Sequence, residues 1–563
     1  MKNMTCRIVC AAAMALLAGV VHSASETLPQ LHRPLDIPMV LSGNFGELRN
    51  NHFHSGLDFK TQGKTGFPIY CAEDGYVSRV LVSPWGFGRA IYVVHPSIGL
   101  TTVYGHLEAF SNKIDKIVRQ EQYRQESFRV DMSFSPDEIP VRKGEIIARS
   151  GNSGSSGGPH LHMDVRETAT ENPLDPMPYF KKYIKDNVAP SVRSIALYPE
   201  DDSGVVDGVG RAAYRQPAKF GEPFVAWGRV VPGIKAYDKM PGVSNIYGVK
   251  YLTLEIDGKQ VYRRVIERFS FDSTRAVHTL VNYPDKVNKS SWVMVTRVPK
   301  SRPLGAMIET DGDNGVITIN EERDYNCRFL LEDEHGNRSS VKFVIRGKRS
   351  EIPEKRDAGT LFRYDGTNSY NMNGLKVMFQ PGTFYDDIYF STKCSDDAGY
   401  CSPVHSVGSA DIPLHKSFDM EIDVTRDTLV DKRKYCLVRI DGKSKRAVPA
   451  EYKEGKMVTR VNRFGKYTVT TETTSPTVTP RRPARWGKRR CVSYRISDGM
   501  SGVESYRGEI DGKFVLFEYD GKSGLLTYRP ESSRVKKGKK HVVTMTVTDA
   551  CGNTTESRST FVW

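Results

Sequence analysis

The residue types best suited to bind a metal ion gather in one stretch, where six of the thirteen histidines lie between His52 and His162. His54 and Asp58 offer an imidazole and a carboxylate four residues apart, and both groups are zinc ligands in proteins. On a straight strand their α-carbons would lie about 13 Å apart, at about 3.3 Å per residue. Two ligands of one ion must converge, so the chain is expected to bend, and Gly56 permits the bend.

A second pattern follows a glycine- and serine-rich stretch, residues 151–158, and reads His160-Leu161-His162. Side chains alternate along a strand, so His160 and His162 project from one face and Leu161 from the other. One histidine can then bind a metal ion while its neighbour lines the site. The glycines allow close approach of the backbone, so this stretch can form a wall of a substrate cleft.

The third element is His106, which follows Gly105 at the end of a strand-like run. A single histidine in this place would normally be structural. His52 is an alternative ligand to His54, but it lacks the four-residue spacing to Asp58. Isolated histidines such as His278, His335 and His541 are taken as structural or surface groups, and His95 is placed with them.

Together the three patterns resemble the lysostaphin or LytM-type zinc metallopeptidases, whose signature is His-x-x-x-Asp, a His preceded by Gly, and His-x-His after a Gly/Ser loop. The resemblance covers about residues 51–165. It implies that His54, Asp58 and His162 bind one zinc ion and that His160 and His106 are the unligated catalytic histidines. Three protein ligands leave a fourth position for water, as in catalytic zinc sites. Which of the two catalytic histidines is the base is left open.

This resemblance implies a hydrolase, a zinc metalloendopeptidase that cuts peptide cross-links of peptidoglycan in the cell wall. A D-alanyl-diaminopimelate bridge is the favoured substrate. The first alternative is a non-catalytic regulator of other cell-wall hydrolases, and the second is a scaffolding protein with a vestigial first domain. Both alternatives expect lost ligands, whereas the three expected ligands are all present.

The N-terminus has the pattern of a secretory signal peptide over residues 1–23, with Lys2 and Arg7 before an apolar run and cleavage expected before Ala24. A retained N-terminal anchor is the alternative. No later stretch is apolar enough to span a membrane, so no span is expected after removal of the signal. We expect an exported protein, with the periplasm favoured and the cell envelope or secretion as alternatives.

The formal net charge of +15 and the pI near 9.2 favour polyanionic surroundings, such as an acidic cell wall. Nucleic acid is not expected as a partner, because the basic runs at 348–356 and 481–490 have no aromatic-interleaved binding motif beside them. Export would permit disulfides, and the sequence suggests Cys394 with Cys401 and Cys491 with Cys551 without proving either pair.

Beyond the histidine patterns, short apolar or alternating runs separated by glycine and proline predict a mainly β fold. We expect an antiparallel-sheet lysostaphin-type peptidase domain followed by immunoglobulin-like β-sandwich domains. The predicted parts are a peptidase domain at 24–185 with a helical insertion near 109–140, an immunoglobulin-like domain at 186–350, a β-rich domain at 356–475 and an immunoglobulin-like domain at 480–563.

Two features carry the prediction of related second and fourth domains. Leu331 to Asn337 and Val547 to Asn553 look like divergent repeats, and Ile-Asp-Gly-Lys turns at 256–259 and 510–513 are strong hairpin signals. The insertion could cap the substrate groove or be a plain surface helix. The β-rich tail could anchor the protein, bind an envelope protein or inhibit the first domain.

Overall fold

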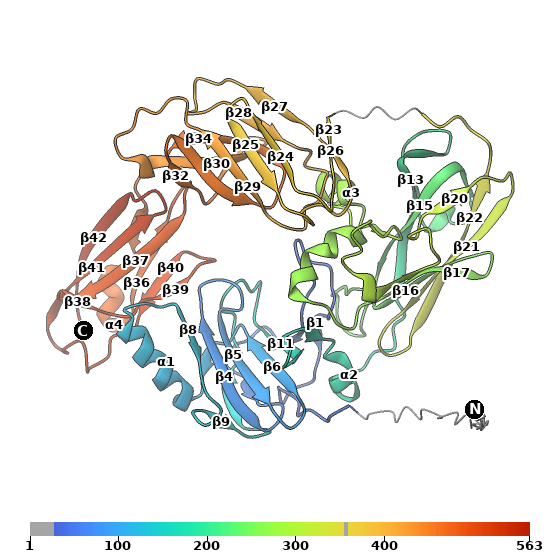
Figure 1. Cartoon of the computed structure of the whole chain (residues 1–563). Helices are drawn as coiled ribbons and strands as arrows, with labels where there is room; N and C mark the ends of the chain where they lie inside the picture. The colour runs from blue at the N-terminus through green and yellow to red at the C-terminus, as the bar shows by residue number, and fades with distance from the viewer. Residues whose placement is uncertain (1–27, 354–358) are drawn as a thin grey trace, which may run out of the picture.

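A computed structural model describes residues 28–353 and 359–563. Its sheets form four successive groups, which Figure 1 shows arranged in a ring. We call them the first (28–185), second (186–353), third (359–472) and fourth (476–563) domains. The predicted signal peptide, residues 1–23, lies outside the described residues. Within the described ranges, no helix combines the length and the apolar character needed to cross a membrane.

The first domain is built on a nine-stranded sheet whose strand pairs are antiparallel. Its elements are β1 (Leu41–Gly43), β2 (Leu57–Lys60), β3 (Pro68–Tyr70), β4 (Gly75–Val82), β5 (Arg89–His95), β6 (Leu100–Gly105), β7 (Ala109–Phe110), α1 (Asn112–Arg124), β8 (Val130–Ser133), β9 (Pro140–Val141), β10 (Ile146–Arg149), β11 (His160–Glu167), β12 (Pro173–Leu174) and α2 (Met177–Phe180). The main strand order is β1-β2-β11-β6-β5-β4-β8, and β3-β10-β7 forms a separate sheet.

The insertion after His106 contains the expected helix, α1, which buries Ile114, Val118 and Gln122 at helical spacing. Strand structure resumes in β8, at Val130, earlier than the Val141 predicted from the sequence. Because β8 pairs with β4, the insertion occupies the edge of the sheet opposite β1 and β2. It therefore lies away from the histidine-bearing strands, and of the two possibilities raised by the sequence this placement does not favour a cap on the groove.

The second domain packs directly on the first. Its elements are β13 (Ser191–Val206), β14 (Ala213–Arg215), β15 (Phe224–Tyr237), β16 (Tyr251–Ile256), β17 (Lys259–Val265), α3 (Tyr283–Lys289), β18 (Met294–Val295), β19 (Ile308–Thr310), β20 (Ile317–Ile319), β21 (Asp324–Glu332) and β22 (Arg338–Gly347). The ring of Phe269 lies 5.2 Å from those of Phe45 and Phe53, and buried side chains of both domains form one apolar cluster. The first two domains thus share a continuous core.

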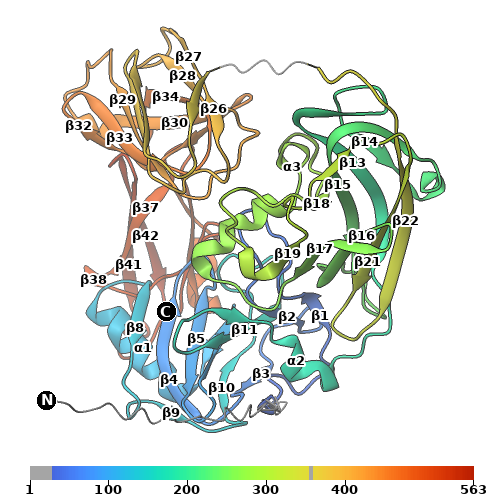
Figure 2. The same cartoon turned by 45° about the vertical axis from the view of Figure 1, so that its right-hand side comes forward.

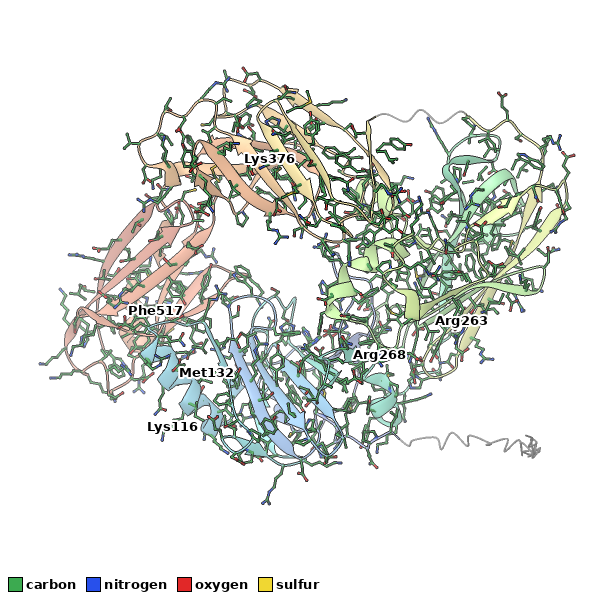
Figure 3. All side chains as sticks on the ribbon, in the orientation of Figure 1. Lys116, Met132, Arg263, Arg268, Lys376 and Phe517 are labelled. Carbon is green, nitrogen blue, oxygen red and sulfur yellow. The ribbon has the colours of Figure 1, made fainter. Side chains whose placement is uncertain are left out.

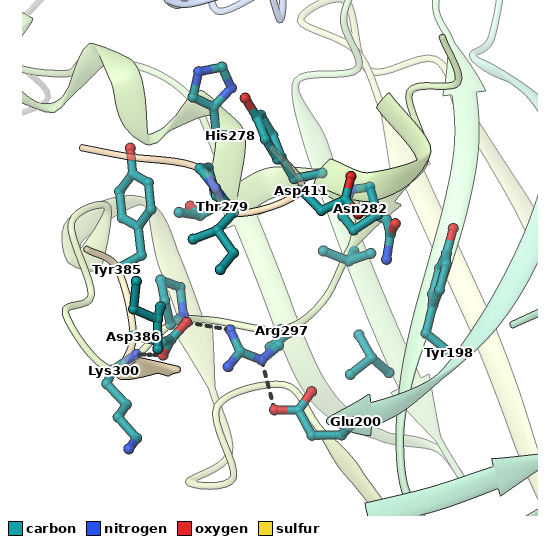
Figure 4. Close-up of a pocket in the computed structure, with 18 of the residues that line it drawn as sticks. Tyr198, Glu200, His278, Thr279, Asn282, Arg297, Lys300, Tyr385, Asp386 and Asp411 are labelled. Carbon is teal, nitrogen blue, oxygen red and sulfur yellow. Dashed lines mark hydrogen bonds and ion pairs between the residues drawn. The ribbon is translucent and has the colours of Figure 1, made fainter. Parts of the chain in front are cut away.

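The third domain has two five-stranded sheets and a small β23-β26 sheet. Its strands are β23 (Thr360–Phe362), β24 (Asn368–Met372), β25 (Leu375–Phe379), β26 (Ile388–Phe390), β27 (Thr392–Ser395), β28 (Val404–Val407), β29 (Phe418–Asp423), β30 (Tyr435–Asp441), β31 (Ser444–Ala447), β32 (Glu451–Lys453), β33 (Lys456–Val461) and β34 (Gly465–Thr471). A pocket of about 660 Å³ is lined by residues of both the second and the third domains. Within it, Arg297 of the second domain contacts Glu200 at 2.7 Å and Asp386 of the third domain at 2.8 Å (Figure 4).

The fourth domain has two four-stranded sheets around a separate apolar cluster. Its elements are β35 (Thr477–Pro480), α4 (Trp486–Arg489), β36 (Val492–Ser497), β37 (Val503–Ile510), β38 (Lys513–Phe514), β39 (Glu518–Asp520), β40 (Leu525–Tyr528), β41 (Lys540–Asp549) and β42 (Thr554–Val562). Short 3-10 helices complete the chain: Lys181–Tyr183, Pro217–Lys219, Phe271–Leu280, Gly305–Met307, Lys432–Lys434 and Pro483–Arg485. The predicted mainly β, antiparallel fold is confirmed.

The predicted Asp-Gly hairpin turns form between β16 and β17 and between β37 and β38. Asp257 and Gly258 both have positive φ, at 50° and 82°, as do Asp511 and Gly512, at 51° and 73°. Two successive positive φ values match the right-handed twist of the flanking strands, which explains the choice of Asp-Gly.

The fourth domain closes the ring against the first, and both views place β38 beside α1 (Figures 1 and 2). The rings of Tyr123 in α1 and Phe514 in β38 lie 6.0 Å apart edge to face. Arg507 pairs with Glu126 at 2.6 Å. Figure 3 labels Lys116 of the first domain and Phe517 of the fourth, the two domains that meet here. The surface of the insertion is therefore a domain contact.

The cysteines do not form the pairs suggested by the sequence. Cys394 and Cys401 are free thiols, and Cys551 packs against Cys436 of the third domain rather than against Cys491. Lys434 strengthens this contact, because its Nζ donates to the carbonyl oxygen of Cys551 at 3.1 Å. The sequence could not show this pair, since the two sulfurs come from different domains.

Candidate metal centre and active site

Three neighbouring strands bring the histidine patterns together. In the pairing of β11 with β2, His162 lies opposite Asp58, and in the pairing of β11 with β6 it lies opposite Gly105. His106 follows Gly105 at the end of β6, and His54 lies in the loop just before β2. Strand order alone thus collects residues that are far apart in the sequence.

The bend predicted before Asp58 is present, because β2 begins only at Leu57. Gly56 serves the bend through close approach to β11. A Cβ at this position would lie 2.2 Å from the carbonyl oxygen of Met163, which no side chain tolerates. Gly56 thus lets the loop carrying His54 lie directly against the strand carrying His162.

The side chains of His54, Asp58 and His162 converge, and all three are buried. His54 Nε2 lies 3.1 Å from Asp58 Oδ1 and 3.1 Å from His162 Nδ1. His162 Nδ1 lies 2.9 Å from Asp58 Oδ1. Ligands at about 2.0–2.1 Å from a tetrahedral ion lie about 3.3 Å apart, close to this spacing. The three atoms could hold one metal ion between them.

Partners on the outer side of each imidazole orient the two histidines. Nδ1 of His54 contacts the carbonyl oxygen of Asn44 at 2.7 Å, an acceptor, so this nitrogen carries the proton. Nε2 of His162 contacts Oδ1 of Asp164 at 2.6 Å and likewise donates. The remaining nitrogens therefore turn lone pairs toward Asp58. Three acceptors facing one another fit a cation.

The carboxylates of Asp164 and Asp58 favour a positive charge on or beside the ring of His162. Burial lowers the pKa of His162, but the charge of Asp164 and hydrogen bonds to Asp164 and Asp58 outweigh it and raise the pKa to about 9. Burial raises the pKa of Asp58, yet the neighbouring histidines hold it well below its usual range. Both shifts describe an anionic pocket that stabilises a proton or a metal ion.

Arg49 is a site residue that sequence reasoning missed. Its Nη2 donates to Oδ2 of Asp58 at 3.2 Å and to Glu47 at 2.9 Å. The contact occupies Oδ2 of Asp58, whereas Oδ1 faces the rings of His54 and His162. Asn44 and Asp164 were missed too. Asp164 had a signal, since it lies two residues after His162 on the same strand face.

His160 and His106 face the same centre from the other side. Nδ1 of His160 donates to the carbonyl oxygen of Gly158 at 2.8 Å, and its Nε2 lies 3.4 Å from Asp58 Oδ1. Nδ1 of His106 donates to the carbonyl oxygen of Ser153 at 2.9 Å. The two rings are 4.8 Å apart. In both cases Nδ1 is occupied, so Nε2 is available to a reacting group.

The backbone holds His106 in an unusual conformation, with φ of 59°. Burial, aided by the charges of His162 and His160, lowers the pKa of His106 to about 3. Its imidazole is therefore neutral at neutral pH. Phe87 lies over this part of the site, with its ring 4.9 Å from that of His162 and 6.2 Å from that of His106.

The remaining histidines of this region lie elsewhere. His52, the alternative ligand, is exposed and outside the group of converging atoms. His95 is buried and contacts Thr102 Oγ1 at 2.8 Å and the carbonyl oxygen of Asp74 at 3.1 Å, as expected of a structural group.

A cleft of about 560 Å³ opens beside Asp58 and His160. Its walls come from β1, β2 and the loops on either side of β2, from the Gly/Ser stretch with the start of β11, and from one residue of the second domain. The lining residues are Ser42, Arg49, Asp58, Lys60, Gln62, Gly63, Gly157, Gly158, Pro159, His160 and Asn245. None belongs to the 109–140 insertion, and the cations Arg49 and Lys60 give the cleft a basic wall.

The fourth domain contacts the same Gly/Ser stretch from outside. Nζ of Lys522 donates to the carbonyl oxygen of Asn152 and, at 3.1 Å, to that of Ser156. Arg89 pairs with Glu518 at 2.9 Å close by. The loop that carries the partner of His106 is therefore supported by a domain more than 350 residues further along the chain.

Comparison with known proteins gives two kinds of likeness. A family model described as a Zu5-like domain matches residues 359–472, the third domain. The DD-carboxypeptidase/endopeptidase Mpg of Neisseria meningitidis serogroup B is 30% identical over 113 residues, 20% of this chain and 20% of that protein. An uncharacterized metalloprotease of Haemophilus influenzae is 33% identical over 111 residues, 20% of this chain and 18% of that protein.

Solved structures include the catalytic domain of lysostaphin from Staphylococcus simulans, at 23% identity, covering 25% of this chain and 92% of that chain with a TM-score of 0.19. A zinc-containing peptidase from Vibrio cholerae has 26% identity, covering 26% of this chain and 38% of that chain, also with a TM-score of 0.19. The alignment spans about a fifth of the length of the curated relatives. Over that fifth, this chain resembles the lysostaphin-type metallopeptidases, as its histidine motifs predict.

Proposed function

We propose that the first domain is a zinc metalloendopeptidase that hydrolyses peptide cross-links of peptidoglycan. His54, Asp58 and His162 would hold one zinc ion. The observation that carries this proposal is the convergence of three acceptor atoms at 2.9–3.1 Å whose outer partners fix their orientation. The donor set of two imidazoles and one carboxylate fits a catalytic zinc with an open fourth position.

When bound, zinc would lower the pKa of water and polarise the scissile carbonyl group. His160 and His106 would do the proton transfer. Each has its Nδ1 proton engaged by a backbone carbonyl, so Nε2 can accept a proton from the attacking water and return it to the leaving amine. Either histidine can be the base, since both face the centre. Phe87 would keep bulk water from the reacting atoms.

The cleft supports a peptide substrate that carries carboxylates. Arg49 and Lys60 line it, and the whole chain has a net charge of +15. Peptidoglycan stem peptides are acidic, so the basic wall would attract them and orient a cross-link across the centre. The name of the Neisseria relative, a DD-carboxypeptidase/endopeptidase, supports the narrower choice of a D-alanyl-diaminopimelate bridge.

The setting that we propose is the periplasm, reached through the signal peptide predicted at residues 1–23. The second to fourth domains would then face the envelope and could bind a protein partner there. We propose that the chain divides near residues 185, 356 and 475, and that the second and fourth domains are immunoglobulin-like. Their matching Asp-Gly hairpins and Asp-to-Asn turns support that relationship.

The test is incubation of the purified mature protein with cross-linked muropeptide dimers, with and without a zinc chelator. We expect cleavage to monomers, its loss with the chelator, and its return when zinc is restored. His160→Ala should abolish cleavage, whereas the exposed His52→Ala is the matched control and should retain it. Cleavage that survives complete zinc removal would refute the mechanism. Stimulation of another hydrolase without any cleavage would instead favour a regulator.

A further inference from the structure

A second group of carboxylates lies at the junction of the first and second domains, apart from the histidine site. Asp186 comes from the linker before β13, Asp238 directly follows β15, and Asp333 directly follows β21. One oxygen from each lies within 4.8 Å of the others. Three segments of chain thus bring three carboxyl groups to one point.

Two of these carboxylates are incompletely paired. Asp238 is 4% exposed, and its Oδ1 has no hydrogen-bond partner among the described residues. Oδ2 of Asp186 is also buried without a partner in that part of the chain. A buried carboxylate oxygen without a donor is costly, and such atoms are rare in folded proteins. A proton, a water or a cation held between the carboxyl groups would satisfy these oxygens.

The space between them suits one small group. The three aspartates line a cavity of about 20 Å³, and a single water or ion needs about 10–15 Å³. Lys250 lines the same cavity, but its ammonium pairs with Asp175 at 2.9 Å and with Glu334. The lysine is therefore engaged by other carboxylates.

The fourth domain provides an internal comparison, because the same sequence patterns recur there. Asp333 accepts from the backbone N and the Nδ2 of Asn337, and Asp549 accepts from the same atoms of Asn553. Asn337 Nδ2 also donates to the carbonyl oxygen of Asp186 at 3.4 Å, as Asn553 does to the preceding linker. The turn itself is thus a structural feature that needs no ion.

The difference lies in the partner aspartates. Asp238 begins the pattern Asp-x-Met-x-Gly-Val after β15, and Asp498 begins the same pattern after β36. Oδ2 of Asp498 accepts from the backbone N of Met500 at 3.0 Å and of Gly502 at 2.8 Å. Asp238 instead leaves Oδ1 unpaired. Of these two aspartates, Asp238 is the one that lies close to two further carboxyl groups, those of Asp186 and Asp333.

We propose that Asp186, Asp238 and Asp333 bind one calcium ion. Calcium takes six to eight oxygen ligands in flexible geometry and accepts both carboxylates and backbone carbonyls. Magnesium usually keeps several waters, for which the small cavity leaves little room. An exported protein would meet free calcium outside the cytoplasm.

The ion would tie Asp186, where the chain leaves the first domain, to the ends of β15 and β21, and so hold the second domain against the first. Asn44 lines the same cavity, and its side chain exchanges hydrogen bonds with the backbone of Gly248 at 2.8 and 3.0 Å. The carbonyl oxygen of Asn44 is the outer partner of His54. Bound calcium would therefore stabilise the domain junction around Asn44, whose carbonyl oxygen orients His54.

The test uses the mature full-length protein, stripped of metal and dialysed, with calcium binding measured by isothermal titration calorimetry. We expect Asp238→Asn and Asp186→Asn to weaken calcium binding about tenfold or more. Asp498→Asn is the matched control in the fourth domain and should keep the affinity. Calcium should raise the Tm of the wild-type protein by about 3 °C or more, and this shift should be absent in Asp238→Asn.

The same calorimetric titration on His162→Ala distinguishes this site from the histidine site, because that variant should still bind calcium. Burial raises the pKa of Asp238 to about 8, so a proton held between the carboxylates is the competing explanation. A wild-type Tm that calcium does not change would overturn the proposal. So would unchanged calcium affinity in Asp238→Asn and Asp186→Asn, or an equal Tm shift with magnesium at the same concentration.

Discussion

Asp164 accepts a hydrogen bond of 2.6 Å from Nε2 of His162, and this contact turns the opposite ring nitrogen toward Asp58. Asp164 is itself fully buried and held by Arg166 and by Ser55. A carboxylate in this position raises the basicity of the histidine and fixes its tautomer. The proposed metal centre would therefore depend on a residue that is not itself a ligand.

The first prediction concerns that residue. Asp164→Asn keeps the side-chain volume but removes the charge, so we expect zinc affinity to fall about 10- to 100-fold. The zinc affinity is measured by competition with a chromophoric chelator. Asp131→Asn is the matched control, because Asp131 pairs with Arg79 on the exposed edge of the same sheet. Equal zinc affinity in the two variants would contradict the role of Asp164.

The second prediction concerns Arg49, which holds Oδ2 of Asp58 and lines the cleft. Arg49→Gln removes a positive charge that would face a substrate carboxylate. We expect kcat/KM on muropeptide dimers to fall about tenfold, mainly through KM. Arg79→Gln is the control and should leave both constants unchanged. A loss confined to kcat would show that Arg49 acts on the metal ligand alone.

The third prediction concerns the fourth domain. Lys522→Ala removes the support of the carbonyl oxygens of Asn152 and Ser156, in the loop whose Ser153 orients His106. We expect kcat to fall about threefold to tenfold, with zinc content unchanged, because a loosened histidine is less often in position. Lys540→Ala, an exposed lysine of the same domain, is the control. A rise in kcat would mean that this contact inhibits the enzyme.

The fourth prediction concerns Cys436 and Cys551, which pack against each other across the third and fourth domains. With oxidised glutathione, the two thiols should lose two electrons and two protons and form a disulfide, while glutathione is reduced. Peptide mapping without reductant measures the link. Burial raises the pKa of the Cys71 thiol to about 12, so Cys71 should stay unmodified as an internal control. A Cys491–Cys551 link would contradict the structure.

Much of the site could be predicted from the sequence. Strand periodicity indicated that His160 and His162 share a face, and the spacing to Asp58 indicated a bend at Gly56. Both arguments are local, so they hold whatever the rest of the fold does. The resemblance to a known signature added His106, which no local argument could distinguish from a structural histidine.

The parts that sequence reasoning missed depend on long-range contacts. Asn44 acts through its backbone carbonyl oxygen, which every residue has, and Arg49 approaches Asp58 only because the loop folds back. The helix α1 was expected from its apolar spacing, but its place at the far edge of the sheet follows from the pairing of β8 with β4. Its contact with the fourth domain joins residues hundreds of positions apart.

The most direct test of the central claim is the zinc content of the purified mature protein and two histidine variants, measured by atomic emission. We predict about one zinc per chain for the wild-type protein and for His160→Ala, and almost none for His162→Ala. The two histidines lie on one strand face, so the pair is matched in place and chemistry. Zinc retained in His162→Ala and lost in His160→Ala would contradict the assignment of ligand and catalytic residue.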